Sequence, residues 1–411
     1  MMTQPSTQFT QSVAANIKYW QQRTQDLTDD TLPALDQERQ NLYRAAKFGL
    51  HVPDAWQGTA ELLLQAFVFV ERRGYWGEWI PMLEQALASC PADNLALRGR
   101  ILDHLGLFYR HNRQLDNAFA AHQEELQIGL MLEDKWREAH ACINLGAVCR
   151  QMRRFVEAET YILQSQSAFQ AIHAPLIKHA FVTLELGLLG KGKGQWAQAE
   201  EYLRYSVSLW REVGDPVYLA NCLKLLGEAL AAQDKTDAAL AAYHEALDCL
   251  AHTENYLDKI RVLNELGSLH LKQANLMEAE RLLLEANASF LLQSGNLFDR
   301  AVVTNNLGAV YLALGRLAEA ERFFRGSIAL WQICNDPVQQ ANTLGGLAEV
   351  KTAQNQLAEA QQLYAQALAL LADFPQDAWG QKLQKGFREA ENVLEQARGV
   401  GGGGGAVMRD A

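Results

Sequence analysis

The chain has 411 residues, 49% of them hydrophobic, and no uninterrupted apolar stretch of the roughly 20 residues that a membrane-spanning helix needs. Its 48 Asp and Glu residues against 37 Lys and Arg give a formal net charge of −11, which argues against nonspecific binding to nucleic acid because clustered Lys and Arg supply the affinity for phosphate. The six cysteines include no CxxC pair, so neither a disulfide framework nor a zinc ribbon is indicated. We expect a cytoplasmic protein without a cofactor.

The first two segments of the chain are predicted to be helical. Residues 1–60 form a capping segment at the start of the molecule. Residues 61–96 form an imperfect version of the helical hairpins that follow, with Trp79 at the position where the later copies have a small residue. Atypical copies of this kind are expected near the end of a repeat array.

Residues 97–371 contain a pattern that repeats about every 40 residues. A Leu-Gly pair, replaced by Leu-Ala in the last copy, recurs at steps of 40 or 41 residues at Leu105-Gly106, Leu145-Gly146, Leu186-Gly187, Leu226-Gly227, Leu266-Gly267, Leu307-Gly308 and Leu347-Ala348. Twelve residues after each pair stands an alanine, namely Ala118, Ala158, Ala199, Ala239, Ala279, Ala320 and Ala360. The agreement of all seven copies predicts seven structural repeats.

Each repeat is predicted to be a hairpin of two antiparallel α-helices. A Gly in one helix and an Ala in the next allow the two helices to approach closely. Polar or glycine-containing turns such as residues 193–195 lie between the helices, and apolar residues recur at helical spacing in segments such as 317–324. The Asp-Pro pairs at 215–216 and 336–337 predict helix starts, because an Asp N-cap before a Pro at the first helical position is favourable, and residues 295–296 mark another boundary.

The end of the chain differs from the repeats in composition. Residues 372–398 are predicted to form a charged amphipathic helix that caps the array. Residues 399–411 include five consecutive glycines and are expected to form a flexible tail. The last six residues are either a disordered end or a tethered peptide meant for a protease or a partner.

The Leu-Gly and Ala pattern resembles the tetratricopeptide repeat family over residues 97–371. The usual period of that family is about 34 residues, and the longer spacing here resembles the helical sensor regions of bacterial signal-transducing ATPases. Residues 35–46 resemble the segment that precedes such sensors, although the sequence contains no nucleotide-binding module. A HEAT or armadillo array has a period of about 40 to 47 residues but lacks this spacing of small residues. The resemblance implies an all-α, right-handed superhelical solenoid of antiparallel helix hairpins.

The resemblance also places the binding surface on the concave face, which the first helix of each hairpin builds. The family positions at −6, −3, +1, +4 and +5 from each Gly give the candidate groove residues Arg100, Arg110, His111, His140, Arg150, Lys191, Lys224, Arg261, Asn264, Lys272, Asn305 and Asn342. Arg and Lys side chains can engage carboxylates, and Asn side chains can pair with the backbone of an extended peptide. The alternative is that these polar residues only keep the face soluble.

Three other patterns are weaker. Residues 187–194 approach a phosphate-binding P-loop, but the Ser or Thr is missing and the repeat register places them at a helix end and in the following turn. His140 and Cys142 lie on one predicted helix, where structural roles are favoured over Cys–His catalysis. His104 and His111 could share a helix face, but no further zinc ligand stands nearby in the sequence.

We therefore predict a non-catalytic scaffold or sensor that binds a peptide or another protein, one with acidic groups, in the concave groove. The main rival is a receptor for a peptide signal that regulates a partner protein. A hydrolase with an unrecognised site is the alternative from another class, but the sequence supplies no set of catalytic groups with matched roles. No metal, nucleic acid or membrane belongs to the predicted function.

Overall fold

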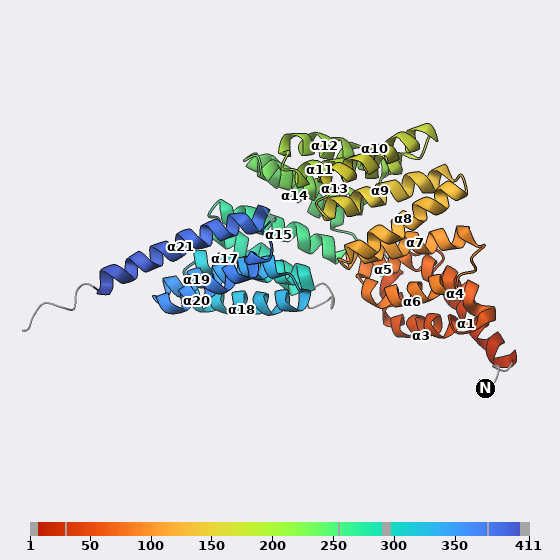
Figure 1. Cartoon of the computed structure of the whole chain (residues 1–411), viewed down its shortest axis with the longest axis horizontal. Helices are drawn as coiled ribbons and strands as arrows, with labels where there is room; N and C mark the ends of the chain where they lie inside the picture. Colours follow the sequence, from red (N-terminus) through yellow and green to blue (C-terminus); the bar gives the residue numbers. More distant parts are fainter. Residues whose placement is uncertain (1–6, 29–30, 254, 290–296, 376–377, 403–411) are drawn as a thin grey trace, which may run out of the picture. The chain divides into compact units, whose positions relative to one another are not determined.

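The computed structural model describes residues 7–28, 31–253, 255–289, 297–375 and 378–402, and in these ranges every regular element is an α-helix (Figure 1). The chain divides into two compact units, Met1–Asp258 and Lys259–Ala411, called unit 1 and unit 2. The predicted all-α class is confirmed.

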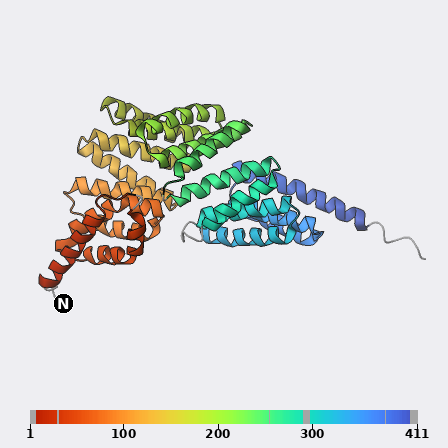
Figure 2. The same cartoon turned by 180° about the vertical axis from the view of Figure 1, so that it is seen from behind.

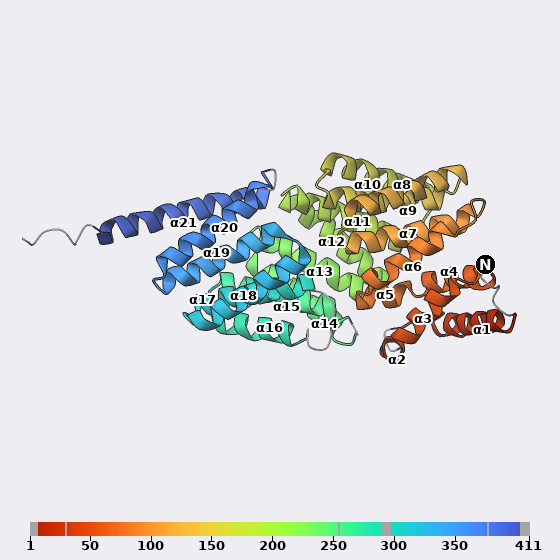
Figure 3. The ribbon, with the colours of Figure 1, turned by 60° about the horizontal axis from the view of Figure 1, so that its bottom comes forward.

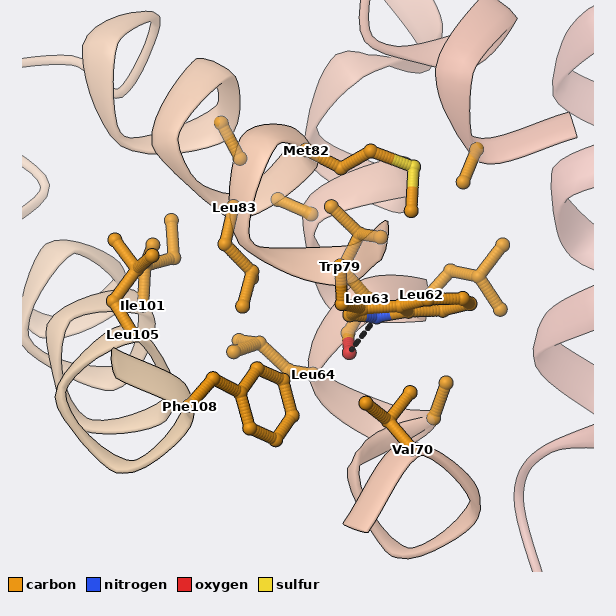
Figure 4. Close-up of a cluster of buried hydrophobic side chains, with 14 of the residues drawn as sticks. Leu62, Leu63, Leu64, Val70, Trp79, Met82, Leu83, Ile101, Leu105 and Phe108 are labelled. Atoms are coloured by element: carbon orange, nitrogen blue, oxygen red, sulfur yellow. Dashed lines mark hydrogen bonds between the residues drawn. The ribbon is translucent and has the colours of Figure 1, made fainter. Parts of the chain in front are cut away.

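Unit 1 begins with six helices, which are α1 (Thr7–Arg23), α2 (Leu32–Gln37), α3 (Arg39–Gly49), α4 (Pro53–Gln65), α5 (Phe67–Arg73) and α6 (Trp76–Ala88). The helix α1 packs on α3 and α4. In the imperfect hairpin predicted over residues 61–96, the first helix is split at Ala66 into α4 and α5. Trp79 of α6 is fully buried against the leucines of α4, and its indole Nε1 donates to the Leu63 carbonyl oxygen at 3.3 Å (Figure 4).

Four regular hairpins complete unit 1. They pair α7 (Leu95–His111) with α8 (Leu115–Met131), α9 (Lys135–Gln151) with α10 (Phe155–Ala171), α11 (Leu176–Gly192) with α12 (Trp196–Val213), and α13 (Pro216–Ala231) with α14 (Thr236–Leu250). The hairpins stack in chain order, and each first helix also contacts the next first helix (Figure 1; seen from behind in Figure 2). First helices lie closest together on the inner side of a curved solenoid, so this side is the concave face.

Unit 2 contains three further hairpins and a last helix. The boundary between the two units falls inside α15 (Tyr256–Lys272), which is described here with unit 2. The other helices of unit 2 are α16 (Leu276–Ser289), α17 (Leu297–Ala313), α18 (Leu317–Cys334), α19 (Pro337–Ala353), α20 (Leu357–Ala372) and α21 (Ala378–Gly402). The helix α21 packs on α20 and α19 (Figure 3), where the Phe387 ring lies 5.6 Å from that of Tyr364, centroid to centroid. The predicted cap over residues 372–398 is therefore a helix that continues to Gly402, and residues 403–411 of the predicted tail lie outside the described residues.

The repeated glycine makes room for a large side chain of the partner helix. A Cβ at Gly227 would lie 2.5 Å from the Tyr243 ring, and one at Gly308 would lie 2.8 Å from the Phe324 ring. In all six Leu-Gly copies the nearest atom belongs to the residue sixteen positions later, which is His122, Ile162, Leu203, Tyr243, Leu283 or Phe324. The seven predicted alanines are all fully buried. The close approach is confirmed, but the glycine fits this large side chain rather than the alanine.

All seven turns within the hairpins share one backbone geometry. The residue seven positions after the repeat glycine, or after Ala348, has φ between 58° and 73°, at Arg113, Arg153, Gly194, Asp234, Ala274, Gly315 and Asn355. The next residue donates its N–H back into the first helix, as Gln114 does to the Tyr109 carbonyl at 2.8 Å. This left-handed cap ends the first helix and sets the start of the second.

The predicted N-caps are confirmed at two hairpin starts. The Asp215 carboxylate accepts hydrogen bonds from the backbone N–H of Val217 and Tyr218 at 2.9 and 3.0 Å. The Asp336 carboxylate accepts from the backbone N–H of Gln339 at 3.1 Å. The boundary predicted at residues 295–296 lies outside the described residues.

Candidate functional site

Three first helices of unit 1 carry charged side chains into a region that α5 and α13 also reach. Arg110 lies on α7, Arg150 on α9 and Glu185 on α11, and Arg150 Nε donates to Glu185 Oε2 at 2.9 Å. Arg110 interacts electrostatically with Glu71, Arg150, Glu185 and Tyr218, and Arg72 interacts with Glu71 and Tyr218. These six residues are called the Arg110 cluster here. The structure thus brings two of the predicted groove residues, Arg110 and Arg150, together.

Burial dominates the electrostatics of the Arg110 cluster. Burial raises the pKa of the Glu71 carboxyl, and Arg72 and Arg110 oppose that rise. Burial lowers the pKa of the Arg110 guanidinium, an effect that Glu185 opposes and Arg150 reinforces. Asp215 and Asp258 also interact electrostatically with Glu71 and raise its pKa further.

Two guanidinium nitrogens of this cluster are buried without a hydrogen-bond partner in the described part of the chain, Arg72 Nη1 and Arg110 Nε. A buried donor without an acceptor costs about 1–3 kcal/mol, and more when it is charged. A carboxylate is the acceptor that best matches a guanidinium group, since it accepts two parallel N–H bonds.

Four other predicted groove residues of unit 1 already have partners. Arg100 is half exposed and contacts Glu61 at 2.9 Å, and the His111 ring stacks on Trp76 at 4.8 Å between centroids. Lys191 and Lys224 both contact Glu228, the latter at 3.4 Å. Burial opposes ionisation of Glu228, but the two lysines outweigh it and lower its pKa.

The candidate residues of unit 2 mainly connect neighbouring repeats. Asn264 is buried and its Oδ1 accepts from Asn306 Nδ2 at 2.8 Å. Asn305 Oδ1 accepts from Thr343 Oγ1 at 3.0 Å. Arg261 contacts Asp299 at 3.0 Å, while Lys272 is exposed and Asn342 is half-buried. Their role in holding a peptide stays a prediction.

His140, the remaining candidate, lies in a second polar cluster that sequence reasoning missed. Its Nδ1 lies 3.5 Å from Asp103 Oδ1 and 3.8 Å from Glu125 Oε1. Glu125 also contacts His122, and both of these side chains are fully buried. The repeat register gives the signal that could have found them, because His122 and Glu125 occupy positions that other repeats fill with apolar or small residues.

The residues of the weaker sequence patterns mostly take part in helix packing. Residues 187–192 lie inside α11, where Gly187 fits Leu203 and Gly190 fits Ala199, and only Gly194 stands in the turn. All six cysteines are free thiols, four of them buried. The His104 ring packs on Phe67 at 4.7 Å between centroids, and burial lowers its pKa. None of the helices in the described ranges combines the length and apolar character that crossing a membrane requires.

The family model of the tetratricopeptide repeat matches residues 180–252 and 299–373, one segment in each unit. No curated protein sequence matches the chain at a significant level. The matched segments cover α12 to α14 with most of α11 in unit 1, and α18 to α20 with most of α17 in unit 2.

Three solved structures share the fold. A Rap protein complexed with competence and sporulation factor is 12% identical, with a TM-score of 0.61 over 89% of this chain and 98% of that chain. A signal transduction ATPase with numerous domains from Pyrococcus horikoshii, which has a tetratricopeptide repeat sensor, is 16% identical, with a TM-score of 0.57 over 85% of this chain and 55% of that one. NprR in complex with its cognate peptide NprX is 13% identical, with a TM-score of 0.50 over 72% and 88% of the two chains.

These matches agree with the repeated hairpins, the buried alanines and the uniform left-handed turns. The long period of about 40 residues leaves the hairpin contacts intact, because the glycine and its large partner keep the same spacing in every copy. Residues 180–252 and 299–373 match the tetratricopeptide repeat family, and the whole chain has the fold of tetratricopeptide-like repeats.

Proposed function

We propose that unit 1 binds a peptide or protein segment through a carboxylate held by the Arg110 cluster. The carboxylate is either an acidic side chain or the C-terminal group of the bound segment. The fold supports this proposal, because two structures that share it, NprR and the Rap protein, were solved with a peptide and with a signalling factor. Binding, without catalysis, is the proposed activity, and the cytoplasm is its proposed location.

The observation that carries the proposal is the pair of buried guanidinium nitrogens without partners, Arg72 Nη1 and Arg110 Nε. Arg150 already donates a hydrogen bond from Nε to Glu185. A carboxylate that reaches Arg72 Nη1 or Arg110 Nε would supply the missing acceptor. Hydrogen bonds to charged groups contribute about 1.5–3 kcal/mol each, so this contact would dominate the affinity for a short segment.

The test is a binding screen against a library of short peptides, each made once with a free C-terminus and once as the amide. We expect selected peptides to contain a carboxylate whose removal weakens binding. The variant Arg110→Gln should weaken the selected peptides by at least about tenfold, the equivalent of one charged hydrogen bond.

The control is Arg100→Gln, which removes an exposed arginine from the same helix α7. It should leave the affinity unchanged. Equal losses in both variants, or selected peptides without any carboxylate requirement, would contradict the assignment of the cluster.

A receptor for a peptide signal is the more specific form of this function. It is favoured by the coverage of the Rap protein and NprR matches, which span 98% and 88% of those chains. In that case a peptide alone should raise the melting temperature of the protein, since a ligand that binds only the folded state stabilises it by mass action.

A further inference from the structure

A group of buried polar side chains lies where α7, α8 and α9 meet in unit 1. Asp103 comes from α7, His122 and Glu125 from α8, and His140 from α9. We propose that these four residues bind a divalent transition-metal ion such as Zn²⁺. This departs from the sequence-based expectation of a protein without a metal.

The repeat register shows that hydrophobic packing does not require these residues. His122 stands sixteen residues after the repeated glycine Gly106. Sixteen residues after the glycine, or after Ala348, the other copies have Ile162, Leu203, Tyr243, Leu283, Phe324 and Tyr364. The position of Glu125, nineteen residues after the glycine or Ala348, is filled by Ser165, Ser206, Ala246, Ala286, Ser327 and Ala367. Only the first regular hairpin therefore has an imidazole and a carboxylate in this layer of the repeats.

Asp103, His122 and Glu125 lie close enough together for one small cation, and His140 lies beside two of them. One ligand atom from each of Asp103, His122 and Glu125 lies within 4.8 Å of the others. His140 Nδ1 is 3.5 Å from Asp103 Oδ1 and 3.8 Å from Glu125 Oε1. His122 Nδ1 lies 3.0 Å from Glu125 Oε2, which leaves Nε2 as the nitrogen of this ring that can bind an ion. Tetrahedral zinc, with bonds of about 2.0–2.2 Å, holds neighbouring ligand atoms about 3.3–3.6 Å apart.

An orphaned nitrogen inside the same cluster independently points to a ligand. His122 is 0% exposed, and its Nε2 has no hydrogen-bond partner among the described residues. This nitrogen faces α7, 2.4 Å from the point that a Cβ on Gly106 would occupy and one helical turn beyond Asp103. A buried imidazole nitrogen without a partner is costly unless something binds it.

The donor set selects the class of metal. Two imidazoles with two carboxylates suit zinc and related transition metals, whereas calcium and magnesium prefer sites made only of oxygen ligands. Asn144 provides an outer support, because its Nδ2 donates to Asp103 Oδ1 at 3.2 Å. Such supporting bonds orient a ligating carboxylate.

Protons compete with the metal at this site. Burial lowers the pKa of His140, but Asp103 and Glu125 outweigh it and raise that pKa overall. Lys178, Cys142 and His104 also interact electrostatically with these residues, and Arg100 interacts with His104. Since a ligating imidazole must be neutral, metal binding should displace a proton and weaken as the pH falls.

The test is isothermal titration calorimetry, in which Zn²⁺ is added to the purified full chain. Melting curves are recorded with and without the ion. The main variant is the double substitution His122→Leu and Glu125→Ser, which installs the residues that stand at the same positions in α12. This variant should fold, because it restores the composition of a neighbouring repeat. We expect one Zn²⁺ per chain and a raised melting temperature for the unmodified protein, and at least a tenfold loss of affinity in the double variant.

Three single variants separate a metal site from a structural charge network. Asn144→Ala should weaken Zn²⁺ by about tenfold, as loss of an outer-shell support does. His252→Leu removes an exposed histidine and should change nothing. Arg110→Gln should bind Zn²⁺ normally whatever its effect on peptides. Absence of a saturable Zn²⁺ signal, or equal affinity in the double variant, would overturn the proposal.

Discussion

Lys351, a buried lysine of unit 2, pairs with two carboxylates, of which Glu321 is closer and less exposed than Glu359. Lys351 is 5% exposed, and its Nζ donates to Glu321 at 2.9 Å and to Gln356 at 2.9 Å. The hydrogen bond from Lys351 outweighs partial burial and, with Arg325 and Gln354, lowers the pKa of Glu321 from 4.5 to about 2. Without Glu321, the buried charge of Lys351 would keep only the more exposed Glu359, at 3.3 Å, as an anionic partner.

We predict that Glu321→Gln destabilises unit 2 by about 2 kcal/mol at neutral pH, below the usual cost of a fully buried pair because glutamine can still accept a hydrogen bond. A carboxyl group whose pKa is lowered by folding stabilises the protein at pH values above its unfolded-state pKa of 4.5. This contribution is lost as the pH falls toward 2, the pKa in the folded state. Urea unfolding at pH 7 and pH 3 should therefore show the difference between variant and unmodified protein shrinking at the lower pH.

The matched control for this prediction is Glu319→Gln in the same turn of α18. Glu319 pairs with Arg316 at the surface, where ion pairs contribute little. Its replacement should leave the unfolding midpoint nearly unchanged at both pH values. A constant deficit of the Glu321→Gln variant across the whole pH range would contradict the assigned role of the carboxylate.

The sequence predicted positions within helices better than it predicted side-chain partners. Every repeat alanine is buried and both Asp N-caps form as expected, because these depend on local spacing. The groove offsets fall on the first helices of the hairpins, but they could not show that Lys191 and Lys224 share Glu228, or that Asn264 bonds to Asn306. Those contacts join different repeats, and a residue's offset within one repeat carries no information about its neighbour's side chains.

At the scale of elements, the hairpin turn is the most uniform part of the structure. Ala274 has φ of 59°, in the left-handed region where a Cβ costs about 1–2 kcal/mol. We predict that Ala274→Gly stabilises the protein by about 0.5–1 kcal/mol, after allowing for the greater freedom of glycine in the unfolded chain. The midpoint of chemical unfolding should rise accordingly.

The reciprocal control is Gly315→Ala, in the equivalent turn between α17 and α18. Gly315 has φ of 72° and nothing within 4 Å of its added Cβ, so only backbone strain would change. The two substitutions should shift the midpoint in opposite directions. A shift of the same sign in both would mean that solvent contacts, and not the backbone conformation, determine stability at this turn.

The hairpins themselves were predictable because their signal is repeated seven times, whereas the first and last elements have no second copy. The split of one predicted helix into α4 and α5 has no sequence marker as strong as the Leu-Gly pair. The buried His122–Glu125 pair was missed for the opposite reason. A repeat pattern contains only what the copies share, so it gives no signal for residues that occur in one hairpin alone.

At the scale of the whole molecule, each hairpin is stabilised mainly by its neighbours in the array. Ala239 of α14 is fully buried, and Ala239→Trp adds a large side chain to a closely packed contact. We predict a loss of about 1–3 kcal/mol or more from overpacking, located first in α13 and α14. Hydrogen exchange followed by mass spectrometry should show the loss of protection decreasing from α13 through α11 and α9.

The control for this prediction is Ala238→Trp, which places the same side chain at an exposed neighbouring position. Protection in α1 to α6 should survive in both variants, because four hairpins of nearest-neighbour contacts need not open together. A uniform loss of protection throughout unit 1 in the Ala239→Trp variant would show instead that the hairpins unfold as one cooperative body. The same experiment with Zn²⁺ present then locates the proposed metal, since its protection should be greatest where α7, α8 and α9 meet.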